Sequence, residues 1–527
     1  MSFVAGWALL VLACTAAAED LLIKGGTVVN ADRQFQADVL IRDGLILRVE
    51  PDLQAERPGT RQLDARGMLV MPGGIDPHTH LAMPFMGQVA CDDFYSQNLL
   101  LAACLSRSGH AAALAGGTTM HIDFVLPVAH DLLAGWAEWQ RKAEAAVMDY
   151  GFHMAVTSWS KQVAADMQVI ASRGVNSFKF FMAYKGALMV TDEQLLAGLR
   201  RCRQLGALAQ VHAENGDAVA EGQARVFEAG VTGPEGHALS RPAALEGEAT
   251  GRAIRLAEFA GAPLYVVHVM SRDAVEEVAR ARQRGVRVIG ETVVSAISQE
   301  EGRLWDPDWD VAAQYVMSPP IRSREHAAAL RAALAGGALQ LVGTDHAVFN
   351  STQKRVGRHD FRLIPNGVNG LEERMHVVWQ ELVNSGQLSP SDFVRVTSTA
   401  AAQIFNIYPR KGVIAPGSDA DVILFDPLLE HSIAAATHHS AMDTNIYEGY
   451  RVQGKVVSTI SRGQLVWHNG KLNITRGTGR FIPTPTFGPL FEGLDKRPEH
   501  LVDVARYGGV PVQRGSIEGK VEARDEL

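Results

Sequence analysis

Four histidines, one lysine and one aspartate lie in or at the ends of short apolar segments, and together they could bind metal ions. These residues are His78, His80, Lys179, His212, His268 and Asp345. Imidazole nitrogen and carboxylate oxygen are ligands that Zn²⁺ prefers when one coordination position must stay open for water. His78 and His80 are two residues apart, so both rings would point to one face of a strand. The pattern predicts the two-metal site of a hydrolase.

Taken singly, these residues also have plainer interpretations. A lone histidine in an apolar strand is more often a core residue than a metal ligand, and His212 and His268 each stand alone in their segments. A lysine between Phe178 and Phe180 would most simply be a buried ammonium paired with an acid. An ammonium has no lone pair for a metal, whereas the neutral amine can react with CO₂ to give a carbamate that could bridge two ions. The residue types do not choose between these forms of Lys179.

The segments that carry these residues alternate with helical patterns. Apolar strands are expected around Ile75, Ile122, Ala155, Phe178, Val211, Val267, Val288 and Val342. Helical spacing of apolar residues separates most of them, for example at 132–147, 193–205, 274–284 and 326–334. Strand–helix units in this number predict an α/β fold, a TIM (β/α)8 barrel, whose catalytic groups lie at the C-terminal strand ends. The candidate ligands fall at the ends of the first, fourth, fifth, sixth and eighth strands.

Short alternating strands broken by turn pairs occur towards both ends of the chain. One precedes Gly25-Gly26, another precedes Asp43-Gly44, and similar strands return at 421–425, 456–461 and 464–467. We therefore expect a smaller composite β-sandwich domain built from residues 19–70 and 408–480, beside a barrel at 71–407. Residues 1–18 are expected to be a signal peptide, and residues 481–527 a C-terminal tail.

Composition narrows the class of protein. The chain has 527 residues, of which 47% are hydrophobic and 20% charged, values ordinary for a soluble globular enzyme. A net charge of −8 argues against nucleic-acid and anionic-membrane partners. The cysteines at 14, 91, 104 and 202 show no paired spacing, so neither a disulfide framework nor a thiolate zinc site is expected.

The two ends carry possible targeting signals. Residues 4–18 are apolar and end in three alanines, which resembles a signal peptide, although no basic residue precedes the apolar run. The final residues Arg524-Asp525-Glu526-Leu527 are similar to an ER-retention tetrapeptide. Together they favour the secretory pathway or the endoplasmic reticulum, where Asn473 could be glycosylated. The alternative is a cytoplasmic enzyme with a misassigned start.

Ten segments of the chain resemble one known family. They include MPGGIDPHTHLAMPFMG, GGTTMHIDFVLP, GVNSFKFFMAYKG, QVHAENGDAVAEGQ, TGPEGHALSRP, PLYVVHVMS, YVMSPPIR, LVGTDHAVFNSTQK, IPNGVNGLEERM and FNIYPRKG. These segments, spread over about residues 20–490, resemble the dihydropyrimidinase branch of the amidohydrolase superfamily, and plant-type members most of all. Residues 97–108 exceed the family pattern by a Leu-rich run.

The resemblance implies a binuclear zinc centre. His78 and His80 would hold one ion with Asp345, His212 and His268 would hold the other, and carbamylated Lys179 (N6-carboxylysine) would bridge both. Asp345 would also act as the acid–base catalyst, and Tyr184 would polarise the substrate carbonyl. Ser318 and Asn366 would bind the ring amide mainly through backbone groups. The family also implies a homotetramer.

The activity implied is hydrolytic opening of a cyclic ureide. The expected reaction converts 5,6-dihydrouracil, and dihydrothymine, to a ureido acid; dihydrouracil would give 3-ureidopropionate, in the second step of reductive pyrimidine catabolism. A hydantoinase or an allantoinase-like cyclic amidase is the alternative within the same chemistry. Another class, the collapsin-response-mediator scaffolds, shares the fold but loses metal ligands, and this chain retains all six.

Overall fold

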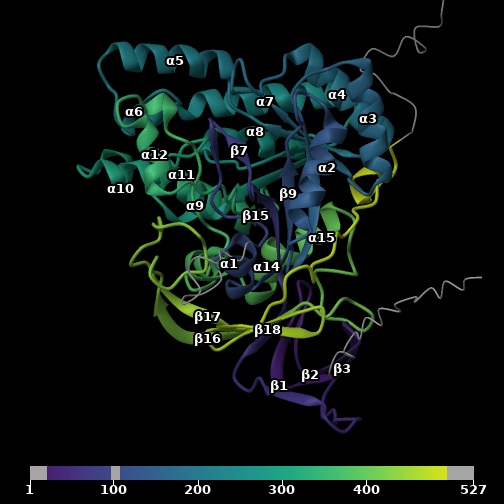
Figure 1. Cartoon of the computed structure of the whole chain (residues 1–527). Coiled ribbons are helices and arrows are strands. Elements are labelled where there is room, and N and C mark those ends of the chain that lie inside the picture. Colours follow the sequence, from purple (N-terminus) through teal and green to yellow (C-terminus); the bar gives the residue numbers. More distant parts are fainter. Residues whose placement is uncertain (1–19, 96–106, 495–527) are drawn as a thin grey trace, which may run out of the picture.

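A barrel and a separate mixed sheet make up the computed structural model of the chain, which describes residues 20–95 and 107–494 (Figure 1). The expected signal peptide, the C-terminal tetrapeptide and most of the Leu-rich run at 97–108 lie outside the described residues. No helix in the described part is long and apolar enough to cross a membrane.

The barrel is a sheet of eight parallel strands that neighbour one another in chain order. The strands are β6 (Gly74–Thr79), β9 (Thr118–Val125), β10 (Asp149–Val156), β11 (Ser177–Phe181), β12 (Leu208–His212), β13 (Leu264–Val266), β14 (Val288–Val293) and β15 (Leu341–Gly343). Seven of the expected strand centres lie inside these elements, and Val267 lies one residue beyond β13. The predicted TIM-barrel architecture is confirmed.

Helices follow most strands and cover the outside of the barrel (Figure 1). They are α1 (Gly109–Ala115), α2 (Leu132–Ala143), α3 (Lys161–Ser172), α4 (Asp192–Leu205), α5 (Gly216–Glu228), α7 (Ala243–Ala260), α8 (Arg272–Gln283) and α11 (Arg324–Ala335). Local capping sets where they begin: the side chains of Asp131, Ser160 and Ser271 accept hydrogen bonds from the first turns of α2, α3 and α8. Gly206 ends α4 in a left-handed conformation.

Hydrogen bonds between β6 and the segment after β15 close the barrel. The Thr344 hydroxyl donates to Asp76 Oδ2 at 2.6 Å, and the Thr344 N–H donates to Asp76 Oδ1 at 3.2 Å. The N–H of His80 donates to the carbonyl of His346 at 2.9 Å. The closing seam therefore lies directly beside two of the candidate metal ligands, His80 and Asp345.

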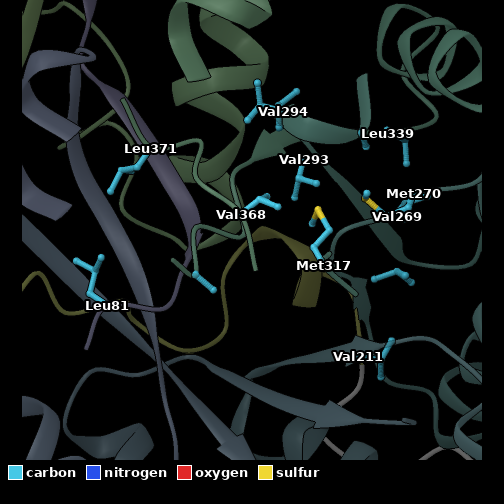
Figure 2. Close-up of a cluster of buried hydrophobic side chains, with 14 of the residues drawn as sticks. Leu81, Val211, Val269, Met270, Val293, Val294, Met317, Leu339, Val368 and Leu371 are labelled. Atoms are coloured by element: carbon cyan, nitrogen blue, oxygen red, sulfur yellow. The ribbon is translucent and has the colours of Figure 1, made fainter. Parts of the chain in front are cut away.

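Alternation along the strands separates two apolar layers. Phe178 and Phe180 of β11 belong to the cluster between strands and helices, which also contains Val211 and Val293 (Figure 2). A second cluster fills the barrel interior with residues such as Ile122, Phe124, Tyr265 and Leu341. Lys179 lies between two outward-facing phenylalanines and therefore points into the barrel.

Strands from residues 21–72 and 422–472 form one composite mixed sheet of nine strands, shown at the foot of Figure 1. Its strands are β1 (Leu21–Val29), β2 (Gln34–Arg42), β3 (Leu45–Glu50), β4 (Arg61–Asp64), β5 (Leu69–Pro72), β16 (Val422–Ser432), β17 (Arg451–Ser461), β18 (Gln464–His468) and β19 (Lys471–Leu472). Antiparallel pairing of β5 with β16 joins the N-terminal and C-terminal parts. This bears out the composite domain expected from the two β-rich ends.

One detail of this sheet differs from expectation. The Gly25-Gly26 pair was expected to end the first strand, but β1 continues to Val29 and its register with β2 shifts between Ile23 and Gly26. A Cβ on Gly26 would lie 2.4 Å from a methyl of Val70, so a close neighbour explains this glycine. The glycines mark a bulge rather than a turn.

A buried ion-pair cluster connects the barrel base to the composite sheet. Lys411 Nζ lies 2.7 Å from Asp149 Oδ2 and 3.0 Å from Asp419 Oδ2, and it also pairs with Asp421. Asp149 is the first residue of β10, whereas Asp421 directly precedes β16. We call Asp149, Lys411, Asp419 and Asp421 the base cluster.

Candidate metal centre

The structure brings every predicted site residue to one pocket at the C-terminal ends of the barrel strands. His78 belongs to β6, Lys179 to β11 and His212 to β12, while His268 and Asp345 follow β13 and β15. The pocket has an empty volume of about 490 Å³, and all six candidate ligands line it together with Tyr184, Ser318 and Asn366. Their convergence from separate strands is the arrangement expected of a TIM-barrel active site.

Three of the candidate ligands form a tight group. Asp345 Oδ1 lies 3.2 Å from His78 Nε2 and 3.1 Å from His80 Nε2. Potential ligand atoms of these residues all lie within 4.8 Å of one another. His78 Nδ1 lies 2.6 Å from Glu291 Oε1, so a proton on Nδ1 would leave Nε2 free to bind a metal.

His212, at the end of β12, and His268, which follows β13, form a second pair. Their ring centroids lie 4.5 Å apart, and that of His268 lies 5.4 Å from the ring of His78. His212 Nε2 lies 2.8 Å from Glu214 Oε2. Glu291 also accepts a hydrogen bond from the backbone N–H of His268, so one carboxylate supports both histidine groups.

Lys179 lines the same pocket as the two histidine groups and has an aromatic environment. Its Nζ is 4.4 Å from the ring centroid of Phe124 and 5.3 Å from that of Phe181. Among the described residues no carboxylate lies within ion-pair distance of Nζ. Burial lowers the pKa of Lys179 to about 8, although the charges of Asp345 and Glu291 act the other way. The simple interpretation, a lysine paired with an acid, therefore does not describe this residue.

Protonation in the pocket favours the metal-binding forms of most ligands. Burial lowers the pKa of His80 to about 4 and that of His268 well below its ordinary value. Burial alone would raise the pKa of Asp345, but the imidazoles of His78 and His80 hold it well below its usual range. His78 is the exception: despite burial, the charges of Glu291 and Asp345 raise its pKa to about 9. These acids attract a positive charge at the place where a metal would supply one.

Several buried ring nitrogens have no hydrogen-bond partner among the described residues. They include His80 Nδ1 and His268 Nδ1, and His78 Nε2 faces only Asp345 Oδ1 at 3.2 Å. Buried polar atoms without partners are rare because each carries a desolvation cost. Imidazole and carboxylate donors around unpartnered nitrogens fit zinc, so the residues of the pocket suit the metal that the family implies.

The predicted substrate-binding residues lie together on the pocket wall. Asn366 Nδ2 donates to Ser318 Oγ at 2.9 Å, and the Tyr184 ring lies 5.1 Å from that of His212. Burial raises the pKa of Tyr184 to about 12, while hydrogen bonds with Ser318 and Asn366 lower it. The phenol therefore remains a hydrogen-bond donor at neutral pH.

Left-handed backbone recurs at the site. Tyr184, His268 and Asp345 have φ angles of 63°, 37° and 51°. Residues other than glycine adopt this region at a steric cost, and such residues cluster where function requires them.

The sequence did not predict the carboxylates that hydrogen-bond the candidate histidine ligands. Glu291 supports His78 and His268, and Glu214 lies against His212. Glu291 is the single charged residue of β14, and a carboxylate in a strand of buried residues was the available signal. His346, the residue after Asp345, has its Nε2 2.9 Å from Asp92 Oδ2 and does not line the pocket.

Comparisons with known proteins agree with the site. Residues 69–466 match the model of the amidohydrolase family. A dihydropyrimidinase of Arabidopsis thaliana is 56% identical over 506 residues, which cover 96% of this chain and 92% of that protein. A D-hydantoinase of Geobacillus stearothermophilus is 42% identical, covering 90% of this chain and 98% of that one. The crystal structure of the dihydropyrimidinase from Brevibacillus agri NCHU1002 superposes with a TM-score of 0.85 at 44% identity, covering 89% of this chain and 99% of that chain. The chain therefore belongs to the amidohydrolase family, in the dihydropyrimidinase branch.

Proposed function

We propose that the pocket holds two zinc ions bridged by carbamylated Lys179 and opens the ring of 5,6-dihydrouracil and dihydrothymine. The activity is that of a dihydropyrimidinase, a cyclic amide hydrolase. The observation that carries the metal proposal is the pocket itself, where unpartnered imidazole nitrogens, Asp345 and Lys179 converge.

The surroundings of Lys179 support carbamate formation. A pKa lowered to about 8 leaves part of the side chain as the neutral amine near neutral pH. That amine adds to the carbon of CO₂ and loses a proton, which gives a carbamate anion in place of an ammonium. His78, His80 and Asp345 would hold one ion and His212 and His268 the other, with the carbamate oxygens shared.

Asp345 is the acid–base residue of the proposed reaction. Bound zinc would supply Lewis-acid chemistry, lowering the pKa of a nucleophilic water and polarising the scissile carbonyl. As the water oxygen bonds to C4 of the ring, Asp345 takes up the proton that the water loses. Breakage of the C4–N3 bond then requires a proton on N3, and Asp345 returns it. Dihydrouracil and one water molecule therefore give a single product, 3-ureidopropionate.

Tyr184, together with Ser318 and Asn366 beside it, would orient the ring and stabilise developing charge. The Tyr184 hydroxyl, kept protonated by its raised pKa, donates to the carbonyl oxygen as negative charge accumulates there. Ser318 and Asn366 line the same pocket and would bind the ring amide through backbone groups.

A steady-state comparison tests the substrate class. Purified full-length chain is assayed with dihydrouracil, dihydrothymine, hydantoin and allantoin, and zinc per chain is measured on the same preparation. We expect the highest kcat/KM with the six-membered rings and two zinc ions per chain. Preference for a five-membered ring would favour the hydantoinase alternative, and turnover without bound metal would contradict the metal proposal.

We also propose a homotetramer, as the family implies, and a secretory location, as the two ends of the sequence suggest. Light scattering on the purified chain tests the first proposal. Imaging of the full-length chain, with and without its first 18 residues, tests the second.

A further inference from the structure

Lys354 is a buried lysine at the back of the pocket wall, outside the set of metal ligands. It is the last residue of α12 (Ser351–Lys354) and only 1% exposed. Its Nζ donates to three carbonyl oxygens, those of Gly367 at 2.8 Å, Val316 at 3.1 Å and Pro365 at 3.2 Å. Within the described residues it forms no ion pair with a carboxylate.

The hydrogen bonding matches the charged form of the side chain. Burial disfavours the ammonium and lowers the pKa of Lys354 to about 7. Three acceptors, however, match the three N–H donors of an ammonium, whereas a neutral amine has only two. Hydrogen bonds to a charged donor are about twice as strong as neutral ones, so this contact holds the backbone firmly.

The three carbonyls belong to the two segments that carry the proposed ring-binding residues. Pro365 and Gly367 flank Asn366, and Val316 lies two residues before Ser318. The N–H of Gly367 donates to the carbonyl of Val316 at 2.9 Å, which ties the segments directly. Lys354 thus holds both pocket-lining segments but does not itself line the pocket.

Holding a carbonyl also fixes the direction of the N–H in the same peptide unit. The cis peptide bonds of the described chain are at Ser318–Pro319 and Tyr408–Pro409, so the units that begin at Val316 and Pro365 are trans. In a trans unit the N–H points opposite to the C=O. The N–H groups of Met317 and Asn366 therefore point away from the ammonium.

Little space remains for this wall to move. Gly367 has a φ of 149°, and a Cβ there would lie 2.0 Å from the carbonyl oxygen of Ala347. The backbone at Gly367 is thus packed between residue 347 on one side and Lys354 Nζ on the other. Asn350 caps α12 by accepting from the N–H of Gln353, which fixes the helix that presents Lys354.

We infer that Lys354 is a positioning residue for the substrate: its ammonium sets the backbone of 316–318 and 365–367 so that Ser318 and Asn366 meet the ring amide. This inference rests on the proposed function. Lys354 would thus affect binding of the ring through Ser318 and Asn366, although its side chain touches neither the metal site nor the substrate. The segments that Lys354 holds are distinct from the metal ligands around Asp345, so zinc binding should not depend on Lys354.

The test compares two substitutions with a matched destabilised control. Lys354→Met keeps the length of the side chain and removes every donor, while Lys354→Gln retains a shorter donor group. Phe393→Leu is the control, because Phe393 is buried against Trp379 and Phe425 and does not line the pocket. KM and kcat for dihydrouracil, zinc per chain and the thermal midpoint are measured for each.

We expect Lys354→Met to raise KM roughly tenfold or more with a much smaller change in kcat, and with zinc unchanged. Lys354→Gln should fall between Lys354→Met and the wild type. Phe393→Leu should lower the thermal midpoint without raising KM. If Lys354→Met does not fold, the comparison of Lys354→Gln with the wild type decides.

Unchanged KM in both Lys354 variants would overturn the inference, and so would an equal rise in KM in the Phe393→Leu control. Absence of turnover by the wild-type chain would overturn the proposed function itself and this inference with it. The two failures are distinguishable, because the second is already seen in the unmodified protein.

Discussion

The mouth and the base of the barrel each bring three potential metal ligands within 4.8 Å of one another, but only at the base does a lysine pair with all three. At the base, Lys411 pairs with Asp149, Asp419 and Asp421. At the mouth, His78, His80 and Asp345 have no ammonium among them, and ring nitrogens of both histidines lack partners. Proximity of ligand atoms therefore does not distinguish the two groups; buried ring nitrogens without hydrogen-bond partners occur at the mouth and not in the base cluster.

The buried lysines of the two regions differ for the same reason. Burial disfavours the charge on Lys411, but its three carboxylates outweigh burial and raise its pKa. Lys179 has aromatic rings as neighbours, and burial lowers its pKa to about 8. Lys411 is therefore fixed as an ammonium by its acids, whereas Lys179, whose neighbours are aromatic rings, can react as the neutral amine.

Among the substitutions in the two regions, replacement of Lys179 should reduce activity and bound zinc the most. Lys179→Ala removes the proposed bridge, so we expect loss of nearly all activity and of much of the bound zinc, measured by turnover and metal analysis. Adding a short carboxylic acid should restore a little of both, because a free carboxylate can partly replace the carbamate oxygens. An active, zinc-replete Lys179→Ala protein would exclude the bridged two-metal site.

Asp345→Asn tests whether the carboxylate at the mouth carries the proton. The amide is similar in shape but cannot act as the base, so kcat should fall by roughly 10²–10⁴, the scale of acid–base catalysis. Steady-state rates at saturating dihydrouracil measure this loss. A near-normal kcat would assign proton transfer to another group, and Glu214 beside His212 would be the first to examine.

Tyr184→Phe separates charge stabilisation from metal binding. The hydroxyl should matter most when charge develops on the carbonyl, so kcat and kcat/KM should fall together. The loss should correspond to a rise of about 2–4 kcal/mol in the activation free energy. Zinc content should stay unchanged. A rise in KM at constant kcat would make Tyr184 a docking residue.

Lys411→Met should have the smallest effect on turnover and a large effect on stability. Removing one partner of a buried ion-pair group leaves uncompensated charge, which costs about 3–5 kcal/mol. We expect a lowered denaturant midpoint with unchanged zinc and nearly unchanged kcat in the protein that remains folded. If zinc or kcat fell specifically, the base cluster and the mouth would not be independent.

The strand positions, and the gathering of the candidate ligands in one pocket, could be predicted because both leave a mark on residue type. Apolar runs flanked by helical patterns located the barrel strands, and imidazole or carboxylate groups at their ends located His78, His212 and Asp345. Both patterns depend only on local sequence. The composite sheet was recognisable because its strands alternate and end in turn pairs.

What the sequence did not reveal depends on contacts between distant segments. Glu291 meets His78 across 213 positions, and no local pattern pairs them. The partners of Lys354 are backbone carbonyls, which every residue possesses and which therefore leave no mark on residue type. The Gly25-Gly26 bulge was taken for a turn because a close neighbour, Val70, explains the glycine only once the sheet has formed.

The left-handed backbone at Tyr184, His268 and Asp345 has a consequence for laboratory evolution. Each of these conformations costs on the order of 1 kcal/mol or more, which glycine would relieve. A library selected only for heat resistance should therefore enrich glycine at these positions, and every such clone would lose turnover as it gained resistance. Selection on both properties should instead leave the three positions unchanged and collect its gains elsewhere in the fold.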